Sequence, residues 1–437
     1  MVLSAARAPR TPRSSRLRRL APAVAGASAL AFALSACAGS AGSGGGAGGG
    51  DAAGAYEAGA SQEEIDAALA DLDPIEITYQ PSAASQESVQ SPSGTVLAEA
   101  IEERSGGKIT VDTVWGQAIA GYDEIHDALG DGRIDLAYTL PVYDPAQFPA
   151  VNALGDALGG LDPSPFVGEM ITNAVATDVA WQTPEIVAEY EDLGIQPIAP
   201  TVASGGYYSV CNSPGVEESD FDGRQVRIAS KTQGELMSHI GASPVSMEYT
   251  ETFEALQRGT VDCTLGQLVP SAEAGIFEVA PHVGYLTETS ISRSPGALLA
   301  GSSFEGLPLG YQQVIFDAYS DYFHGQMMTT INENSVAIGM AKEAGGEIEQ
   351  LPEEFQQDII EFSEDKRAEL ADSGVAGDEL QARVEDSAAK WASTIEELGY
   401  ADEGTTEDFD EWFDEDTDFR PVGQAIFDEV ILPHRPS

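Results

Sequence analysis

The residues with the clearest chemical potential are two arginines, Arg224 and Arg227, in the stretch FDGRQVRIAS (221–230). The chain of 437 residues holds only 21 lysines and arginines against 72 aspartates and glutamates, so two cations within four residues are unusual here. Alternate residues of a strand face opposite sides, so Val226 and Ile228 would pack inward while Arg227 points the other way. An arginine near the carboxyl end of a strand can hold a carboxylate through two parallel hydrogen bonds. Spacing alone favours an ordinary ion pair with one of the many carboxylates, and a contact to an anionic ligand is the alternative.

Recognisable catalytic and metal-binding motifs do not occur in the sequence. The five histidines stand singly, and there is no H-E-x-x-H zinc motif, no G-x-S-x-G nucleophile turn and no P-loop. Three aspartates near the end, Asp414, Asp416 and Asp418, imitate a calcium loop but lack its glycine and its distal glutamate. We therefore expect a protein that is not an enzyme and that holds no metal or other cofactor.

The amino terminus reads as an export signal. Residues 1–19 hold six arginines and no acidic residue, and an apolar stretch follows that ends in Leu34-Ser35-Ala36-Cys37. This ending resembles a bacterial lipobox, which predicts a lipoprotein signal peptide over 1–36 and a lipid on Cys37; an ordinary secretory signal with a chance cysteine is the alternative. Residues 38–60 contain ten glycines, so we expect 37–73 to be a flexible tether with a reach of roughly 25 Å.

Charge narrows the class of partner. Without the signal peptide the chain keeps all 72 acidic residues and loses six arginines, which makes its net charge still more negative than the −51 of the whole chain. Nucleic acid and anionic lipid surfaces need basic patches, so neither is expected as a partner. Beyond Cys37 the sequence has two cysteines, Cys211 and Cys263, which in an exported protein can pair or can remain two buried thiols.

The elements that must position Arg227 follow an alternating pattern. Strands are predicted at 75–79, 108–116 and 133–140 with helices at 94–103 and 122–132 between them, which indicates a parallel sheet with crossover helices. A second α/β unit begins near 205, with predicted strands at 207–211, 224–229 and 260–265 and helices at 232–240 and 250–257. Three helical segments follow, at 308–345, 352–374 and 376–398. The acidic tail, 401–437, reads as a solvated cap or a short docking helix.

Four segments resemble, in the same order, the TRAP-type C4-dicarboxylate-binding receptors of the DctP family. They are AEAIEERSGGKITVDTVWGQ (98–117), IHDALGDGRIDLAY (125–138), DFDGRQVRI (220–228) and GASPVSMEYTETFEALQRGTVDC (241–263). Each match alone is weak, but the ordered set spans about 75–310 and is specific. The resemblance implies that Arg227 makes a bidentate contact to a ligand carboxylate, as the arginine of the corresponding strand does in that family.

The resemblance also implies the fold and its division. It predicts an α/β, two-lobed periplasmic-binding-protein (Venus flytrap) fold, type II-like, with long C-terminal helices that span the lobes. Lobe I would comprise 74–203 and 288–331, and lobe II would comprise 204–287 with the helices of 332–400 packed on it. The protein would capture an organic acid between the lobes and deliver it to the membrane subunits of a TRAP transporter, held on the extracytoplasmic side of the membrane by its lipid.

The candidate ligand-binding residues are those that the predicted strands bring to the cleft. Besides Arg227 they are Tyr79, Trp115, Gln117, Tyr138, Tyr207, Tyr208 and Gln267; Glu251 is interpreted as a capping or surface residue. The sequence departs from the family where a second arginine often stands, because Ser204–Ser209 holds tyrosines and no cation. A monocarboxylate or a larger, more hydrophobic acid is therefore at least as well supported as a C4-dicarboxylate. The alternatives are a receptor for an ABC importer or a sensor kinase and, less favoured, an exported hydrolase.

Overall fold

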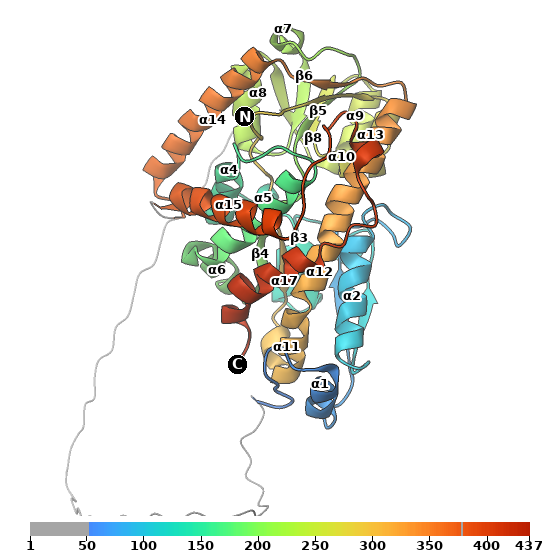
Figure 1. Cartoon of the computed structure of the whole chain (residues 1–437), viewed down its shortest axis with the longest axis vertical. Helices are drawn as coiled ribbons and strands as arrows, with labels where there is room; N and C mark the ends of the chain where they lie inside the picture. The colour runs from blue at the N-terminus through green and yellow to red at the C-terminus, as the bar shows by residue number, and fades with distance from the viewer. Residues whose placement is uncertain (1–51, 377–378) are drawn as a thin grey trace, which may run out of the picture. The chain divides into compact units, whose positions relative to one another are not determined.

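The computed structural model describes residues 52–376 and 379–437 (Figure 1). The predicted signal peptide, Cys37 and the glycine-rich start of the tether lie outside these residues. Among the helices that are described, none is both long enough and apolar enough to cross a membrane.

Lobe I is built on a five-stranded sheet with the strand order β2-β1-β3-β10-β4. Its strands are β1 (Ile75–Gln80), β2 (Ile109–Thr113), β3 (Leu136–Thr139), β4 (Gln196–Val202) and β10 (Gly296–Ala300). As predicted, β1 runs parallel to β2 and β3. The expectation of a parallel sheet fails at β10, which lies antiparallel to both β3 and β4. The chain reaches β10 only after it has passed through lobe II, so no local strand–helix–strand pattern predicts this strand.

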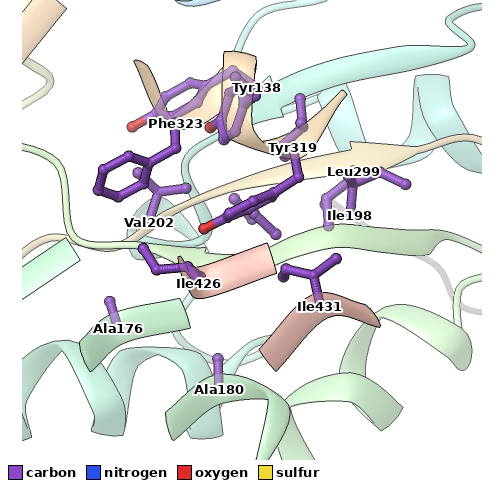
Figure 2. Packing of buried hydrophobic residues seen from close by; sticks show 14 of the residues in the cluster. Tyr138, Ala176, Ala180, Ile198, Val202, Leu299, Tyr319, Phe323, Ile426 and Ile431 are labelled. Atoms are coloured by element: carbon purple, nitrogen blue, oxygen red, sulfur yellow. The ribbon is translucent and has the colours of Figure 1, made fainter. Parts of the chain in front are cut away.

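Helices cover this sheet and bury its apolar faces. They are α1 (Gln62–Leu69), α2 (Pro92–Arg104), α3 (Ile125–Gly130), α4 (Pro149–Ala157), α5 (Val167–Trp181), α6 (Pro184–Glu191), α11 (Leu309–Asp317), α12 (Tyr319–Met327), α15 (Leu380–Glu397), α16 (Phe409–Trp412) and α17 (Arg420–Ile426). Helix α5 is buried along almost its whole length. It packs against β4 and α15. Its small residues Ala176 and Ala180 lie beside Ile426 and Ile431 of the C-terminal segment (Figure 2).

Lobe II is built on a six-stranded sheet with the order β11-β9-β5-β8-β6-β7. Its strands are β5 (Tyr208–Cys211), β6 (Gln225–Ile228), β7 (Ser243–Ser246), β8 (Cys263–Gly266), β9 (His282–Tyr285) and β11 (Ile348–Gln350). The helices beside it are α7 (Glu218–Phe221), α8 (Lys231–His239), α9 (Thr252–Gln257), α10 (Leu268–Glu273), α13 (Glu333–Glu343) and α14 (Glu353–Ser373). Strand β6 runs parallel to β7 and β8, which sets Arg227 level with Val245 on one side and Thr264 on the other.

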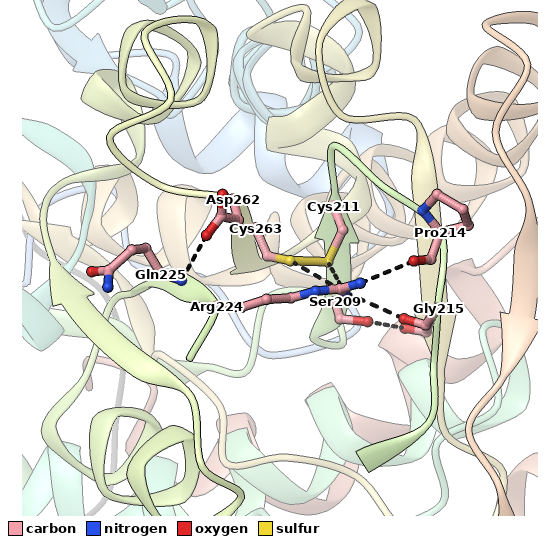
Figure 3. The surroundings of a disulfide bond; sticks show 9 residues. Ser209, Cys211, Pro214, Gly215, Arg224, Gln225, Asp262 and Cys263 are labelled. Atoms are coloured by element: carbon pink, nitrogen blue, oxygen red, sulfur yellow. Dashed lines mark hydrogen bonds between the residues drawn. A yellow bond between two sulfur atoms is a disulfide. The ribbon is translucent and has the colours of Figure 1, made fainter. Parts of the chain in front are cut away.

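A disulfide between Cys211 and Cys263 joins β5 to β8, which resolves the choice that the sequence leaves open (Figure 3). The two half-cystines are direct partners in the antiparallel register of these strands. Arg224 lies against the sulfur atoms and donates to the carbonyl oxygens of Pro214 at 2.9 Å and Gly215 at 3.3 Å. Arg224 is therefore a structural residue that holds the loop after β5.

Besides the step from α14 in lobe II to α15 in lobe I, the chain passes between the lobes at three places. Two are the connections 203–206, which leads from β4 to Tyr207 at the entry of lobe II, and 286–295, between β9 and β10. The third is a helical run in which α12 continues through a π-helical turn, Met328–Asn332, into α13. Helix α12 packs beside α2 in lobe I, and α13 packs on α10 in lobe II (Figure 1). This run is the helix spanning both lobes that the resemblance implies.

Three boundaries differ from those expected. The segment 52–73, predicted as tether, is folded and contains α1, because Ile65 and Leu69 form an apolar stripe that is buried on lobe I. Helix α15, expected on lobe II, packs on α5 in lobe I. The tail 401–437 is not a solvated cap, since Phe409 and Phe419 are fully buried in the core of lobe I. The other alternative, a short docking helix, agrees with α16, which packs on α13. The tail packs on the core because apolar residues are spaced through its acidic sequence. The apolar side chains enter the core, and the acidic side chains remain in water.

Asp156 of α4 provides a pH-dependent contact between the lobes. Its Oδ2 accepts a hydrogen bond at 3.0 Å from Thr232 Oγ1 of α8. Burial raises the pKa of Asp156 from 3.8 to about 6, with Glu235 adding to the rise and Thr232 and two lysines, Lys231 and Lys366, opposing it. A carboxyl whose pKa is higher in the folded protein than in the unfolded chain favours folding while it is protonated.

We expect this contribution of Asp156 to be complete below about pH 4 and to be lost as the pH rises through about 6. Asp156→Asn should therefore flatten the dependence of unfolding free energy on pH in this window, which denaturant titrations at pH 4 to 7 would measure. The control is Asp372→Asn, at an exposed position of α14. Parallel curves for Asp156→Asn and the wild type would contradict the assignment.

Candidate functional site

A cavity lies between the two lobes, with an empty volume of about 670 Å³ that includes the part open to solvent. Lobe I, lobe II and two of the connections between them all contribute to its wall. The residues from lobe I include Ser82, Gln90, Tyr122, Tyr138 and Tyr143; those from lobe II include Tyr207, Arg227, Tyr249, Thr264 and Gln267; and the connections add Ser204 and Ser294.

Arg227 is the cation of this wall, and no carboxylate of the described residues pairs with it. The residue is 3% exposed, and its Nε donates to the carbonyl oxygen of Met247 at 2.9 Å. Its Nη2 is buried without a hydrogen-bond partner, and the ion pairs formed by the described residues do not include Arg227. With Nε occupied, the outer edge of the guanidinium remains available to two oxygens of a carboxylate. An unpaired buried cation is costly to keep, so a ligand anion is its natural partner.

The other deeply buried arginines show what a structural pairing looks like in this chain. Arg293, 2% exposed, lies in the connection 286–295 and donates from Nη1 to both carboxylate oxygens of Glu169, at 2.9 and 3.2 Å. Arg435 makes a two-pronged pair with Asp317 at 2.7 and 2.9 Å. Arg227 is as buried as these residues but lacks the carboxylate, so the ordinary ion pair favoured by spacing alone is not what forms.

Five tyrosines make the cavity unusually aromatic. Tyr122, Tyr138 and Tyr143 come from lobe I, and Tyr207 and Tyr249 come from lobe II. The ring centroid of Tyr122 lies 6.3 Å from that of Tyr143 and 6.4 Å from that of Tyr249, with tilted planes in both pairs. Burial raises the pKa of Tyr249 to about 12, so its phenol is neutral at physiological pH. Burial also raises the pKa of Tyr143, although the positive charge of Arg227 opposes that rise.

Four of the eight predicted ligand-binding residues line the cavity: Arg227, Gln267, Tyr138 and Tyr207. Tyr138 shares a 2.8 Å hydrogen bond with Ser204 Oγ, and Gln267 Nε2 donates to the carbonyl oxygen of Gly205 at 3.1 Å. Both contacts tie a lining side chain to the first connection between the lobes. That these residues touch a ligand stays a prediction.

Tyr79, Tyr208 and Trp115 are not brought to the cavity. Tyr79 is 1% exposed in the core of lobe I, where its hydroxyl donates to the Ser93 carbonyl oxygen at 3.1 Å. Tyr208 follows Tyr207 and therefore faces the opposite side of the lobe II sheet, in the core. The Trp115 ring packs over Gly94 of α2, where an added Cβ would lie 3.0 Å away.

Gln117 supports the cavity wall without being part of it. Its Nε2 donates to the Ser82 carbonyl oxygen at 3.1 Å and to the Tyr122 hydroxyl at 3.3 Å, and both partners line the cavity. Gln80 acts on the same loop, because its side chain bonds the backbone of Ile119 and Ala120 just before Tyr122. The sequence analysis therefore pointed to the loop before Tyr122. It predicted that Gln117 contacts the ligand, whereas in the structure Gln117 holds this loop in place.

Sequence reasoning missed Tyr122, Tyr143, Tyr249 and Thr264 as lining residues. Thr264 had a usable signal, since it lies on the strand beside β6 in register with Arg227. Tyr249 lies in the short turn Tyr249–Glu251 just before α9, so no predicted strand end points to it. Glu251 is exposed and forms no side-chain cap, which agrees with a surface residue and not with a capping one.

The lobes touch each other around the cavity. Glu273 Oε1 of α10, in lobe II, accepts a hydrogen bond at 2.6 Å from Ser88 Oγ and another at 3.3 Å from the Ala84 N–H, both in lobe I. In the part of the chain that the structure describes, no cluster of three or more metal-ligating side chains occurs. The arrangement is suited to enclosing a small anion between two bodies.

Comparisons with known proteins agree with this geometry. Residues 82–372, well over half of the chain, match the model of the bacterial extracellular solute-binding proteins of family 7, DctP. A solute-binding protein of Verminephrobacter eiseniae is 26% identical over 237 residues, which is 53% of this chain and 67% of that protein. Two further curated relatives are matched over 44% and 62% of their own lengths, less than two thirds.

Solved structures share the fold at low sequence identity. A marine metagenome TRAP solute-binding protein in complex with 3-hydroxybenzoate superposes with a TM-score of 0.63 at 17% identity, covering 73% of this chain and 99% of that one. A TRAP periplasmic solute-binding protein of Shewanella oneidensis with bound succinate gives 0.59 at 15% identity, covering 72% and 99%. The predicted two-lobed α/β fold is confirmed. The chain belongs to the DctP family, the TRAP-transporter solute-binding proteins that form family 7 of the bacterial extracellular solute-binding proteins.

Proposed function

We propose that this protein is an extracytoplasmic receptor that captures an organic acid by its carboxylate and delivers it to the membrane subunits of a TRAP transporter. The observation that carries the proposal is Arg227, which lines the interlobe cavity, is 3% exposed and has a buried Nη2 without a partner among the described residues. A carboxylate seated there would satisfy both the charge and the hydrogen-bond donors of the guanidinium.

The ligands of related structures support the choice of an acid. The metagenome protein was solved with 3-hydroxybenzoate and the Shewanella protein with succinate, and both molecules carry carboxylates. Closure of two lobes on a ligand would give the membrane subunits a shape to distinguish loaded from empty receptor. The lipobox-like ending at Cys37 supports a lipid anchor on the outer face of the membrane.

A thermal-shift screen of residues 52–437 against small organic acids tests the proposal. Binding to the folded state at 100-fold above Kd should add about 2.7 kcal/mol to the unfolding free energy. Arg227→Met keeps the apolar stem and removes the charge, so we expect it to weaken binding by about 3 kcal/mol, more than a hundredfold. The ligand-free variant should unfold no earlier than the wild type, because an unpaired buried charge has been removed.

Arg224→Met is the matched control, since Arg224 lies three residues away and bonds backbone carbonyls outside the cavity. It should lower stability but keep the full ligand-induced shift. An equal shift in Arg227→Met and the wild type would overturn the proposed role of Arg227. Uptake that requires an ABC permease, and is not supported by large and small TRAP membrane subunits, would replace the delivery partner with the alternative one.

A further inference from the structure

The charged residues that line the cavity limit which charged groups a ligand can have. Arg227 is the lining cation among the described residues, and the lining contains neither lysine nor histidine nor any carboxylate. The other buried arginine near the connections, Arg293, is not part of the lining and is neutralised by Glu169. A second ligand carboxylate would therefore be desolvated without a cation, and a ligand ammonium would be desolvated without an anion.

The shape of the wall limits the body of the ligand. Aromatic side chains from both lobes face the cavity, and the tilted pairs around Tyr122 leave ring faces and edges turned in several directions. Aromatic rings attract each other in offset or edge-to-face arrangements beyond the area that they bury. A flat aromatic ring bound here is stabilised both by burial and by ring–ring contacts with the tyrosines. A puckered saturated ring of the same size is stabilised by burial alone.

Gln267 is one of several polar residues of the lining that could bind a substituent on that ring. Gln267 uses Nε2 to bond the Gly205 carbonyl oxygen, and its Oε1 accepts no hydrogen bond from the described residues. An amide oxygen fixed in this way can accept from a ring hydroxyl without reorganising.

We propose that the ligand is an aromatic monocarboxylate, with its carboxylate on Arg227, an uncharged ring between the tyrosines and room for a hydroxyl donor beside Gln267. This inference rests on the proposed function and adds the chemical class of the ligand. It excludes C4-dicarboxylates and zwitterions from the tightest-binding compounds, because each brings a charge that the wall does not pair.

Matched ligand pairs test the two parts of the inference by calorimetric titration. Benzoate against cyclohexanecarboxylate changes the aromatic character of the body, and we expect benzoate to bind at least about fivefold more tightly. 4-Nitrobenzoate against benzene-1,4-dicarboxylate changes the charge at nearly constant shape, and we expect the dicarboxylate to bind at least a hundredfold more weakly. Succinate joins the panel as a dicarboxylate without a ring.

Tyr207 offers the matched variants, because it is half-buried and lines the cavity directly before β5. Tyr207→Leu should reduce the preference for benzoate over cyclohexanecarboxylate, and Tyr207→Phe should preserve it. Succinate or cyclohexanecarboxylate binding that equals or exceeds benzoate binding, and that is lost in Arg227→Met, would overturn the inference while the proposed function stands. Failure of every acid in the panel to bind in an Arg227-dependent manner would overturn both.

Discussion

Glu169→Gln is expected to lower the free energy of unfolding by about 3–5 kcal/mol, because it leaves the Arg293 guanidinium buried without its counterion. Both side chains are fully buried, at 0% exposure, and Glu169 Oε1 also accepts the Gly206 N–H at 2.8 Å. Burial raises the pKa of Glu169, while Arg293 and the Gly206 N–H oppose that rise. The pair joins α5 to both strand connections between the lobes, so we expect its loss to destabilise both lobes together.

Urea unfolding followed by circular dichroism would measure this effect. Glu254→Gln is the control, since Glu254 pairs with Arg258 on an exposed helix face where both side chains are at least 66% exposed. Such a surface pair contributes little. The double variant Glu169→Gln/Arg293→Met should recover part of the loss, because it removes the uncompensated charge. A single variant as stable as the wild type would show that the pair does not hold the connections together.

Removal of the Cys211–Cys263 disulfide is expected to cost about 4 kcal/mol. The two cysteines are 52 residues apart, and closing a loop of this length removes that much chain entropy from the unfolded state. The closed segment contains β6 with Arg227 and the loop with Tyr249. We therefore expect the double variant Cys211→Ala/Cys263→Ala to unfold earlier and to bind its ligand less well near the transition.

The contribution of the disulfide should be measured both by chemical reduction and by mutation. Reduced wild type should approach the double variant in denaturant midpoint, and the reducing agent should not change the midpoint of the double variant. The double alanine avoids the free thiol that either single variant would leave. A difference below about 1 kcal/mol between oxidised and reduced protein would mean that the hydrogen bonds of β5 and β8 alone hold these strands together.

Much of the architecture could be predicted because its signals are local. The first three strands and the helices between them follow period-2 and period-3.6 patterns that end at glycines. Strand β10 could not be predicted in this way, because it reaches its place between β3 and β4 only after the chain has built most of lobe II. The sequence left the tail open between a solvated cap and a docking helix for a related reason: composition reports acidity, whereas burial of Phe409 and Phe419 depends on a core made elsewhere in the chain.

The sequence by itself determined the family, the scarcity of cations and the strand that carries Arg227, since each of these is written in neighbouring residues. The tertiary structure alone decided that Arg293 pairs with a carboxylate while Arg227 pairs with none in the part of the chain that the structure describes. It also decided that Tyr207 faces the cavity while Tyr208 faces the core, and that tyrosines of both lobes meet. Alternation along a strand separates two faces, but only the packing of the second lobe and its neighbouring strands makes one of them the wall of a binding site.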